Sequence, residues 1–243
     1  MTENTEFVQS LYGNADSGTV LVQMVDDHDL AFIEKEIVHI EELTGSKDFL
    51  LAAIKVKNWN TDLSPWPAPP VFGEEAFGSG AAQTLQYLTE QLLPSLGGGT
   101  PSSDRSFLLG GYSLAGLFAL WSAYQTGLFS GVAAASPSVW FPGFCGYVQE
   151  NRIQTEAVYL SLGDREERTK NPVMSQVGNA IRTIHAHLDA AGIPCVLEWN
   201  KGNHFKNPDL RTAKAFTWLL DRGLRQEENK DVSADLASAC LSC

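Results

Sequence analysis

Short apolar runs rich in β-branched residues alternate along this chain with longer segments of helical periodicity. The apolar runs predict strands at 19–25, 49–56, 106–111, 131–135, 157–162 and 194–199. The periodic segments predict helices at 29–44, 80–93, 114–125, 172–191 and 208–222. Because a helix must carry the chain back across the sheet, strands joined in this way pair in parallel through right-handed crossovers. The pattern therefore predicts a mostly parallel, doubly wound α/β sheet with helices on both faces.

The first predicted helix shows how its bounds are drawn. Asp29 can cap its N-terminus and Gly45 ends it. Apolar residues recur between them at intervals of three and four, which predicts one buried stripe. The stripe consists of Leu30, Ile33, Ile37, Ile40 and Leu43.

The length of 243 residues suits one α/β domain, and neither an internal repeat nor an interdomain linker is visible. Hydrophobic residues make up 44% of the chain, which is enough to build a core and excludes wholesale disorder. We expect a single domain over residues 1–225. The polar, weakly periodic segment 226–243 is predicted to be a disordered tail.

The charge balance limits the partners of this chain. A net charge of −12 would repel nucleic-acid backbones and anionic membranes. The N-terminus is acidic where a secretory signal would be basic and then apolar, and no stretch approaches the ~18 apolar residues of a spanning helix. Four scattered cysteines, at 145, 195, 240 and 243, favour reduced thiols. We therefore expect a cytoplasmic protein with neither nucleic-acid nor membrane partners.

In such a sheet the functional groups lie on loops at the carboxyl ends of the strands. The loop after the strand 106–111 reads Gly111-Tyr112-Ser113-Leu114-Ala115-Gly116 and runs into an apolar helix, which indicates a nucleophile elbow. This sharp turn brings Gly111 and Ala115 into near contact, so both must be small. It raises the Ser113 hydroxyl above the sheet and directs amides at the helix start, including that of Leu114, toward an incoming oxyanion.

His204 is the candidate general base. In this arrangement the partners of the nucleophile follow in the order serine, acid, histidine, and His204 lies between the last predicted strand and the last helix. His39, His185 and His187 lie within helices and are expected at the surface. His28 precedes the serine in the chain and is a candidate substrate neighbour.

The acid should come from the loop after the strand 157–162, where three carboxylates compete. Glu166 ranks first, because the acid commonly falls three residues after the glycine that closes the strand, here Gly163. Asp164 ranks second and Glu167 third. Those not used would be solvated loop charges, for which Arg165 and Arg168 are nearby partners.

Aromatic and basic residues border the same loops. We predict substrate contacts at His28, Trp59, Trp66, Tyr112 and Trp140. The two loop tryptophans could instead pack within their own proline-rich loop, 58–73. Basic residues could admit an anionic ester; they are Lys57, Arg165, Arg168, Lys170, Lys201 and Lys206. The segment after Trp140 is short, so we expect no large lid.

At these residues the chain resembles the putative esterase family of α/β hydrolases, over roughly Val20 to Leu220. Four segments carry the resemblance: Val25-Asp26-Asp27, the elbow 111–116, Ala135-Ser136-Pro137-Ser138-Val139-Trp140 and Gly202-Asn203-His204. The long N-terminal β-meander of many relatives is missing, which implies an α/β-hydrolase sheet trimmed to about six strands.

The resemblance implies that the backbone amide of Asp27 is the second oxyanion donor. Asp27 stands where relatives have glycine, which could bring a carboxylate close to the site. Ala115 replaces the second elbow glycine. Neither change removes a backbone N–H, because only proline would.

Together these features predict a serine esterase that cleaves a small-molecule carboxylic ester through an acyl-enzyme, without metal or organic cofactor. Two alternatives stay open. The same triad could pass the acyl group to an alcohol or sugar, or the fold could be a binding protein that has lost its chemistry. The sequence does not identify the ester or the oligomeric state.

Overall fold

The computed structural model describes residues 7–98 and 105–223. The predicted tail at 226–243 and the last two cysteines lie outside these residues. The described chain forms a seven-stranded sheet in the order β1-β3-β2-β4-β5-β6-β7. Its strands are β1 (Val8–Gly13), β2 (Thr19–Val25), β3 (Leu50–Lys55), β4 (Ser106–Tyr112), β5 (Gly131–Ala135), β6 (Ala157–Gly163) and β7 (Cys195–Asn200). All neighbouring pairs are parallel except β1 with β3.

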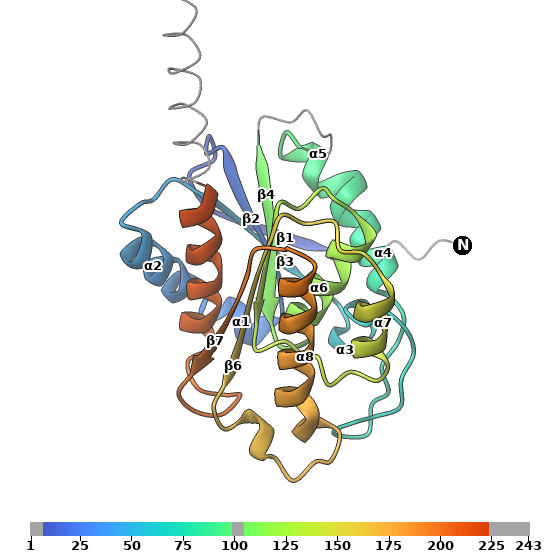
Figure 1. Cartoon of the computed structure of the whole chain (residues 1–243). Helices are drawn as coiled ribbons and strands as arrows, with labels where there is room; N and C mark the ends of the chain where they lie inside the picture. The colour runs from blue at the N-terminus through green and yellow to red at the C-terminus, as the bar shows by residue number, and fades with distance from the viewer. Residues whose placement is uncertain (1–6, 99–104, 224–243) are drawn as a thin grey trace, which may run out of the picture.

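Helices cover both faces of the sheet (Figure 1). They are α1 (Asp27–Leu30), α2 (Ile33–Thr44), α3 (Trp59–Asp62), α4 (Ala81–Tyr87), α5 (Leu93–Ser95), α6 (Leu114–Gln125), α7 (Phe144–Glu150) and α8 (Val177–Ala190). A further helix spans 208–223. Helix α2 and the helix 208–223 lie on one face, and α4, α6 and α8 lie on the other.

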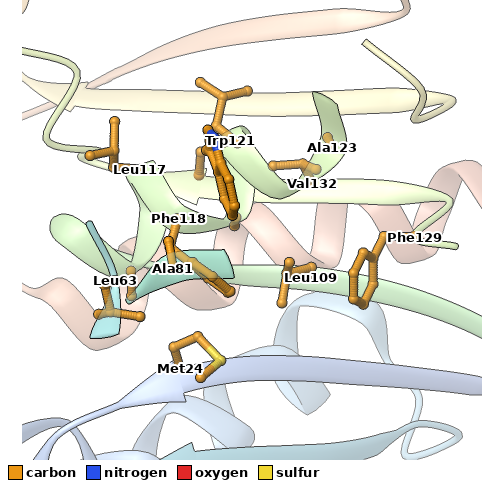
Figure 2. Close-up of a cluster of buried hydrophobic side chains, with 14 of the residues drawn as sticks. Met24, Leu63, Ala81, Leu109, Leu117, Phe118, Trp121, Ala123, Phe129 and Val132 are labelled. Carbon is orange, nitrogen blue, oxygen red and sulfur yellow. The ribbon is translucent and has the colours of Figure 1, made fainter. Parts of the chain in front are cut away.

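Each face carries its own hydrophobic core because successive side chains of a strand point to opposite sides. In β2, Val20 and Val22 join the larger core, whereas Leu21 joins the smaller core. Figure 2 shows part of the larger core, where Phe118 of α6 lies among Leu109, Met24 and Leu63. The parallel strands β2 to β6 are thus buried on both faces, as their continuous apolar runs predicted, whereas the edge strand β7 is partly exposed.

Every predicted strand is present with bounds within one residue, and α6 and β5 have the predicted bounds. The expected number of strands was one too low, because β1 was missed. This strand pairs with a neighbour on one side only, and its sequence VQSLYG is half polar. Val8 is 58% exposed and Leu11 is 45% exposed, so the apolar periodicity that reveals buried strands is weak here.

The first predicted helix is two helices. Asp26, and not Asp29, is the N-cap: its Oδ1 accepts from the Asp29 N–H (2.8 Å), and the Asp29 carboxylate accepts from the Asp26 N–H (3.4 Å). This reciprocal capping box ends the strand and starts α1 at Asp27. The predicted stripe was wrong at Leu43, which is 47% exposed, while Glu36 lies on the buried face of α2.

Two other helical predictions need correction. The segment 80–93 is helical but is interrupted by a π-helical turn at Leu88–Leu92. The short helix α7 was not predicted; its residues FCGYVQE include a glycine and follow Gly143 in the left-handed region (φ 82°). Each helix in residues 7–98 and 105–223 is too short or too polar to cross a membrane.

Candidate active site

The turn between β4 and α6 has the geometry that its small residues predicted. Ser113 has φ 59° and ψ −119°, an uncommon conformation for a residue with a side chain. Its N–H donates to the Ala135 carbonyl of the neighbouring strand (3.1 Å), which supports this conformation. A Cβ atom added to Gly111 would lie 2.5 Å from Cβ of Ala115. The chain therefore closes this turn only because residue 111 has no side chain.

His204 meets Ser113 although 91 positions separate them in the sequence. Its Nε2 lies 3.1 Å from Ser113 Oγ, within hydrogen-bond range. The Oγ atom also lies 3.3 Å from Oγ of Ser138, in the loop after β5. The imidazole side chain is 26% exposed, so His204 is partly accessible to solvent.

Among the three competing carboxylates, Glu166 contacts the imidazole. Its Oε2 lies 2.7 Å from His204 Nδ1. Asp164 instead accepts a hydrogen bond from the Gly202 N–H (2.9 Å), which ties the β6 loop to the histidine loop. Glu167 pairs with Arg182 of α8 (3.0 Å). Ser113, His204 and Glu166 therefore form a continuous hydrogen-bonded chain.

The second oxygen of Glu166 is surrounded by donors. Oε1 accepts hydrogen bonds from the Gly163 N–H (2.7 Å), the Ser136 hydroxyl (2.8 Å) and Arg211 Nη1 (2.7 Å). Burial raises the pKa of Glu166, but the hydrogen bond and charge of His204, with the hydrogen bonds from Gly163 and Ser136, outweigh it and leave the pKa below 4.5. Glu166 is therefore an anion at neutral pH.

The sequence analysis did not predict that Arg211 and Ser136 donate hydrogen bonds to Glu166. Arg211 is 2% exposed and lies in the helix 208–223. A signal was available, because Arg211 stands four residues before Ala215 and eight before Leu219, both buried. A charge on such an apolar stripe requires a buried partner. Ser136 has a positive φ of 42°, which no sequence pattern indicated.

The two amides predicted to face an oxyanion both begin helices. Leu114 is the first residue of α6, and Asp27 is the first residue of α1. N–H groups in the first turn of a helix have no acceptor within it. The helices follow β4 and β2, which are neighbours in the sheet. The Asp27 side chain is 83% exposed and pairs with Lys55 Nζ (2.5 Å), so its carboxylate is a solvated ion pair.

The polar atoms of two predicted substrate contacts, Tyr112 and Trp66, bind backbone carbonyls of the protein. Tyr112 is 8% exposed, and its hydroxyl donates to the His204 carbonyl (2.5 Å) from beneath the loop. Trp66 donates from Nε1 to the Pro142 carbonyl (2.8 Å) and packs against Phe144 and Tyr147. The packing partners of Trp66 therefore lie in and before α7, and not within its own loop 58–73 as the alternative had it.

The remaining predicted contacts lie at the ends of strands. His28 is exposed on α1, and Trp59 begins α3 half-buried. Trp140 is half-buried and meets Phe72 and Phe77 edge-on, each at 6.0 Å between ring centres. All six basic rim residues of the sequence analysis are exposed.

Two further groups border the site. Phe205, directly after His204, is 85% exposed and was not predicted.

Among the described residues, one group has the spacing of metal ligands: Asp26, His28 and Asp29, with ligand atoms within 4.8 Å of one another. The two carboxylates of this group already form the reciprocal cap of α1.

Comparison with known proteins places these residues in context. The family model described as "Putative esterase" matches residues 49–201, more than half of the chain. No curated protein sequence matches this chain. Among solved structures, siderophore hydrolase EstA from Aspergillus nidulans is similar at a TM-score of 0.65 and 18% identity, over 88% of this chain and 89% of that one.

Two bacterial structures are also similar. An IroE-like serine hydrolase from Shewanella oneidensis gives a TM-score of 0.67 at 15% identity, over 88% of this chain and 74% of that one. The BES protein from Bacillus cereus gives a TM-score of 0.60 at 15% identity, over 89% of this chain and 90% of that one. At these identities the likeness concerns the fold.

Proposed function

Because this chain belongs to the putative esterase family, has the α/β-hydrolase fold and is a carboxylic ester hydrolase, we propose that it works as a serine esterase with Ser113 as nucleophile. His204 is the general base, Glu166 orients it, and the amides of Leu114 and Asp27 bind the oxyanion. The observation that carries the proposal is the hydrogen-bonded chain Ser113–His204–Glu166, with distances of 3.1 and 2.7 Å.

The acylation step follows from this geometry. His204 Nε2 takes the Ser113 proton as Oγ forms a bond to the ester carbonyl carbon, whose oxygen becomes an anion. Each amide donor would contribute about 3–4 kcal/mol to stabilising this oxyanion. His204 then gives the proton to the departing alkoxide as the C–O bond breaks. The products are a free alcohol and an acyl-Ser113 ester.

Water completes the cycle in the second step. His204 accepts a proton from water as its oxygen attacks the acyl carbonyl, and returns that proton to Ser113 Oγ when the acyl bond breaks. The Glu166 anion stabilises the imidazolium that forms in both steps, which is the reason for an acid with a lowered pKa.

Substrate size and charge are part of the same proposal. Exposed cations on the loops 163–171 and 200–207 favour an ester that carries negative charge. Two similar structures are siderophore hydrolases, so iron-chelating esters belong in the first substrate panel beside chromogenic esters of increasing acyl length. The single-domain extent of 1–225 and the cytoplasmic location stay predictions.

A fluorophosphonate probe tests the nucleophile. We expect one adduct on Ser113 in the folded protein, no adduct in Ser113→Ala, and nearly complete loss of turnover in Ser113→Ala and His204→Ala. Folded protein without an adduct would favour the non-catalytic binder. Product analysis with added alcohols distinguishes hydrolysis from acyl transfer, because only transfer yields the new ester.

A further inference from the structure

We propose that Arg211 is a positioning residue that sets both the acid and the histidine of this site. The inference rests on the proposed function, because it concerns the residues that the mechanism uses. Arg211 does not contact Ser113; it acts through Glu166 and the histidine loop. Its guanidinium touches groups from four segments that meet at the carboxyl end of the sheet.

The first contact is with the acid. Arg211 Nη1 donates to Glu166 Oε1 at 2.7 Å, and the Gly163 N–H and Ser136 hydroxyl donate to the same oxygen. A carboxylate oxygen has two lone pairs, so three donors saturate Oε1. The carboxylate cannot rotate without breaking these bonds, which leaves Oε2 directed at His204 Nδ1.

The second contact is with the backbone that carries the histidine. Arg211 Nη2 donates to the Asn203 carbonyl (2.9 Å). Nη1 also donates to the Tyr112 hydroxyl (3.1 Å), which in turn donates to the His204 carbonyl. The carbonyls on both sides of the His204 N–Cα bond are therefore held, one directly and one through Tyr112. A single guanidinium therefore holds both the carboxylate that faces the imidazole and the backbone that carries it.

Packing keeps the guanidinium in place. The helix that carries it lies directly on the sheet at two glycines. A Cβ atom added to Gly110 would lie 2.6 Å from Phe216, and one added to Gly131 would lie 2.8 Å from Leu219. Helix 208–223 therefore has little freedom to slide. Arginine spreads its donors over separate nitrogens in a rigid planar fork, so that Nη1 and Nη2 reach different acceptors, whereas all three donors of lysine lie on one nitrogen.

The test compares Arg211→Met and Arg211→Lys with the wild type, using Arg182→Met as a matched control. Arg182 also pairs with a glutamate of the same loop, Glu167, but at the surface. We expect kcat to fall about 10- to 100-fold in Arg211→Met with KM changed less than about twofold, because misplacing catalytic groups slows the reaction without removing substrate contacts. The value of kcat should fall less in Arg211→Lys, and kcat of Arg182→Met should match that of the wild type.

A spectroscopic measurement separates positioning from general damage. The proton between His204 Nδ1 and Glu166 should give a downfield ¹H NMR signal in the wild type and in Arg182→Met. We expect this signal to weaken or shift in Arg211→Met while the amide spectrum elsewhere is retained. In Arg211→Ala, added guanidinium should restore part of kcat, whereas equal NaCl should not.

The outcomes distinguish the two proposals. A wild type that neither hydrolyses esters nor reacts with fluorophosphonate at Ser113 overturns the proposed function. An active wild type with unchanged kcat and an unchanged downfield signal in folded Arg211→Met overturns the positioning role alone. If Arg211→Met does not fold, Arg211→Lys decides: a wild-type kcat in that variant contradicts the need for the guanidinium fork.

Discussion

The proposed mechanism depends on which carboxylate of the β6 loop faces the imidazole, and in the structure this carboxylate is Glu166. Glu166→Gln keeps the shape of the side chain but removes the charge that stabilises an imidazolium and offers a donor where an acceptor is needed. We expect kcat to fall by about 10⁴-fold, the loss that this change causes in comparable triads. Steady-state kinetics on a chromogenic ester would measure it.

Asp164→Asn is the matched control for that measurement. Asparagine Oδ1 can still accept from the Gly202 N–H, so the loop contact survives and kcat should stay within about threefold of the wild type. A large loss in Asp164→Asn with little loss in Glu166→Gln would assign the acid to Asp164, the second alternative of the sequence analysis.

The elbow offers a second test at the residue scale, because one close contact defines it. Gly111→Ala should be destabilised by about 1–3 kcal/mol, since its Cβ would clash with Ala115 at 2.5 Å. Adding Ala115→Gly removes the clashing methyl. The double variant should therefore be about 1 kcal/mol less stable than the wild type, no less stable than Ala115→Gly alone, when the free energy of unfolding is measured by urea denaturation. Ala115→Gly alone should cost about 1 kcal/mol through its helix propensity.

A double variant as unstable as the sum of the single variants would contradict this account of the turn. Fluorophosphonate labelling of Ser113, compared between Gly111→Ala and the double variant, provides a separate check on the position of Ser113. The two measurements together show whether the contact limits stability, nucleophile geometry or both.

Sequence order was enough to predict three residues that the structure brings into hydrogen-bond contact. Ser113 follows a strand and precedes a helix, His204 follows the last strand, and the glycine before Glu166 ranked that residue first. The apolar stripe around Arg211 indicated that this residue is buried with a partner, but the partners of Arg211 and Ser136 come from other loops, and those distances follow only from tertiary packing. Trp66 illustrates the same difficulty, since an aromatic residue in a loop can border a ligand or pack on a neighbouring helix.

At the scale of elements, the strands inside the sheet and the edge strand β7 were predictable, whereas the edge strand β1 was not. A strand buried on both faces shows a continuous apolar run, as β2, β4 and β6 do. β1 has half of its surroundings in solvent, so tertiary pairing with β3 decides its conformation. The break between α1 and α2 was missed because the capping role was assigned to Asp29 and not to Asp26.

Helix α2 buries the carboxyl group of Glu36 against the sheet, and this burial makes the stability of the protein depend on pH. Glu36 is 5% exposed, and burial raises its pKa well above 4.5 despite a hydrogen bond from Gln23. Burial and the nearby charge of Asp26 raise the pKa of Asp29 from 3.8 to about 6. Asp209, held by Lys35, adds further negative charge near Glu36.

The sign of the effect follows from proton binding. Between about pH 4 and 6 the folded chain keeps a proton on Asp29 that the unfolded chain releases, and Glu36 likewise keeps its proton above the usual range of a glutamic acid. The contribution of these acids to stability is therefore lost as the pH rises through their folded pKa values. Glu36→Gln removes the cost of ionising a buried acid. We expect it to stabilise the protein at pH 8 by on the order of 1 kcal/mol and to change stability less at pH 5.

Thermal denaturation at both pH values measures this difference. Glu34→Gln is the control, because Glu34 is exposed on the same helix and its neutralisation should shift the melting temperature equally at both pH values or not at all. An equal gain from Glu36→Gln at pH 5 and pH 8 would mean that ionisation of Glu36 is not the cause.

At the scale of the whole molecule, the acidic excess acts against the compact state. The net charge is −12, and its excess negative charges repel one another more strongly in the folded chain than in an expanded one. Salt shortens the range of this repulsion, from a Debye length of about 30 Å at 10 mM to about 8 Å at 150 mM. Since the second length is smaller than a domain of this size, screening should relieve much of the repulsion.

We therefore expect the melting temperature at pH 8 to rise by about 2–4 °C when NaCl is raised from about 10 to 150 mM, the shift that corresponds to roughly 1 kcal/mol in a chain of this length. The gain should shrink near pH 5, because the calculated isoelectric point is about 4.8 and little net charge remains to be screened. Differential scanning calorimetry in matched buffers measures both shifts. A fall at pH 8 would show that the surface ion pairs weakened by salt, such as Asp27–Lys55, contribute more to stability than the net repulsion removes.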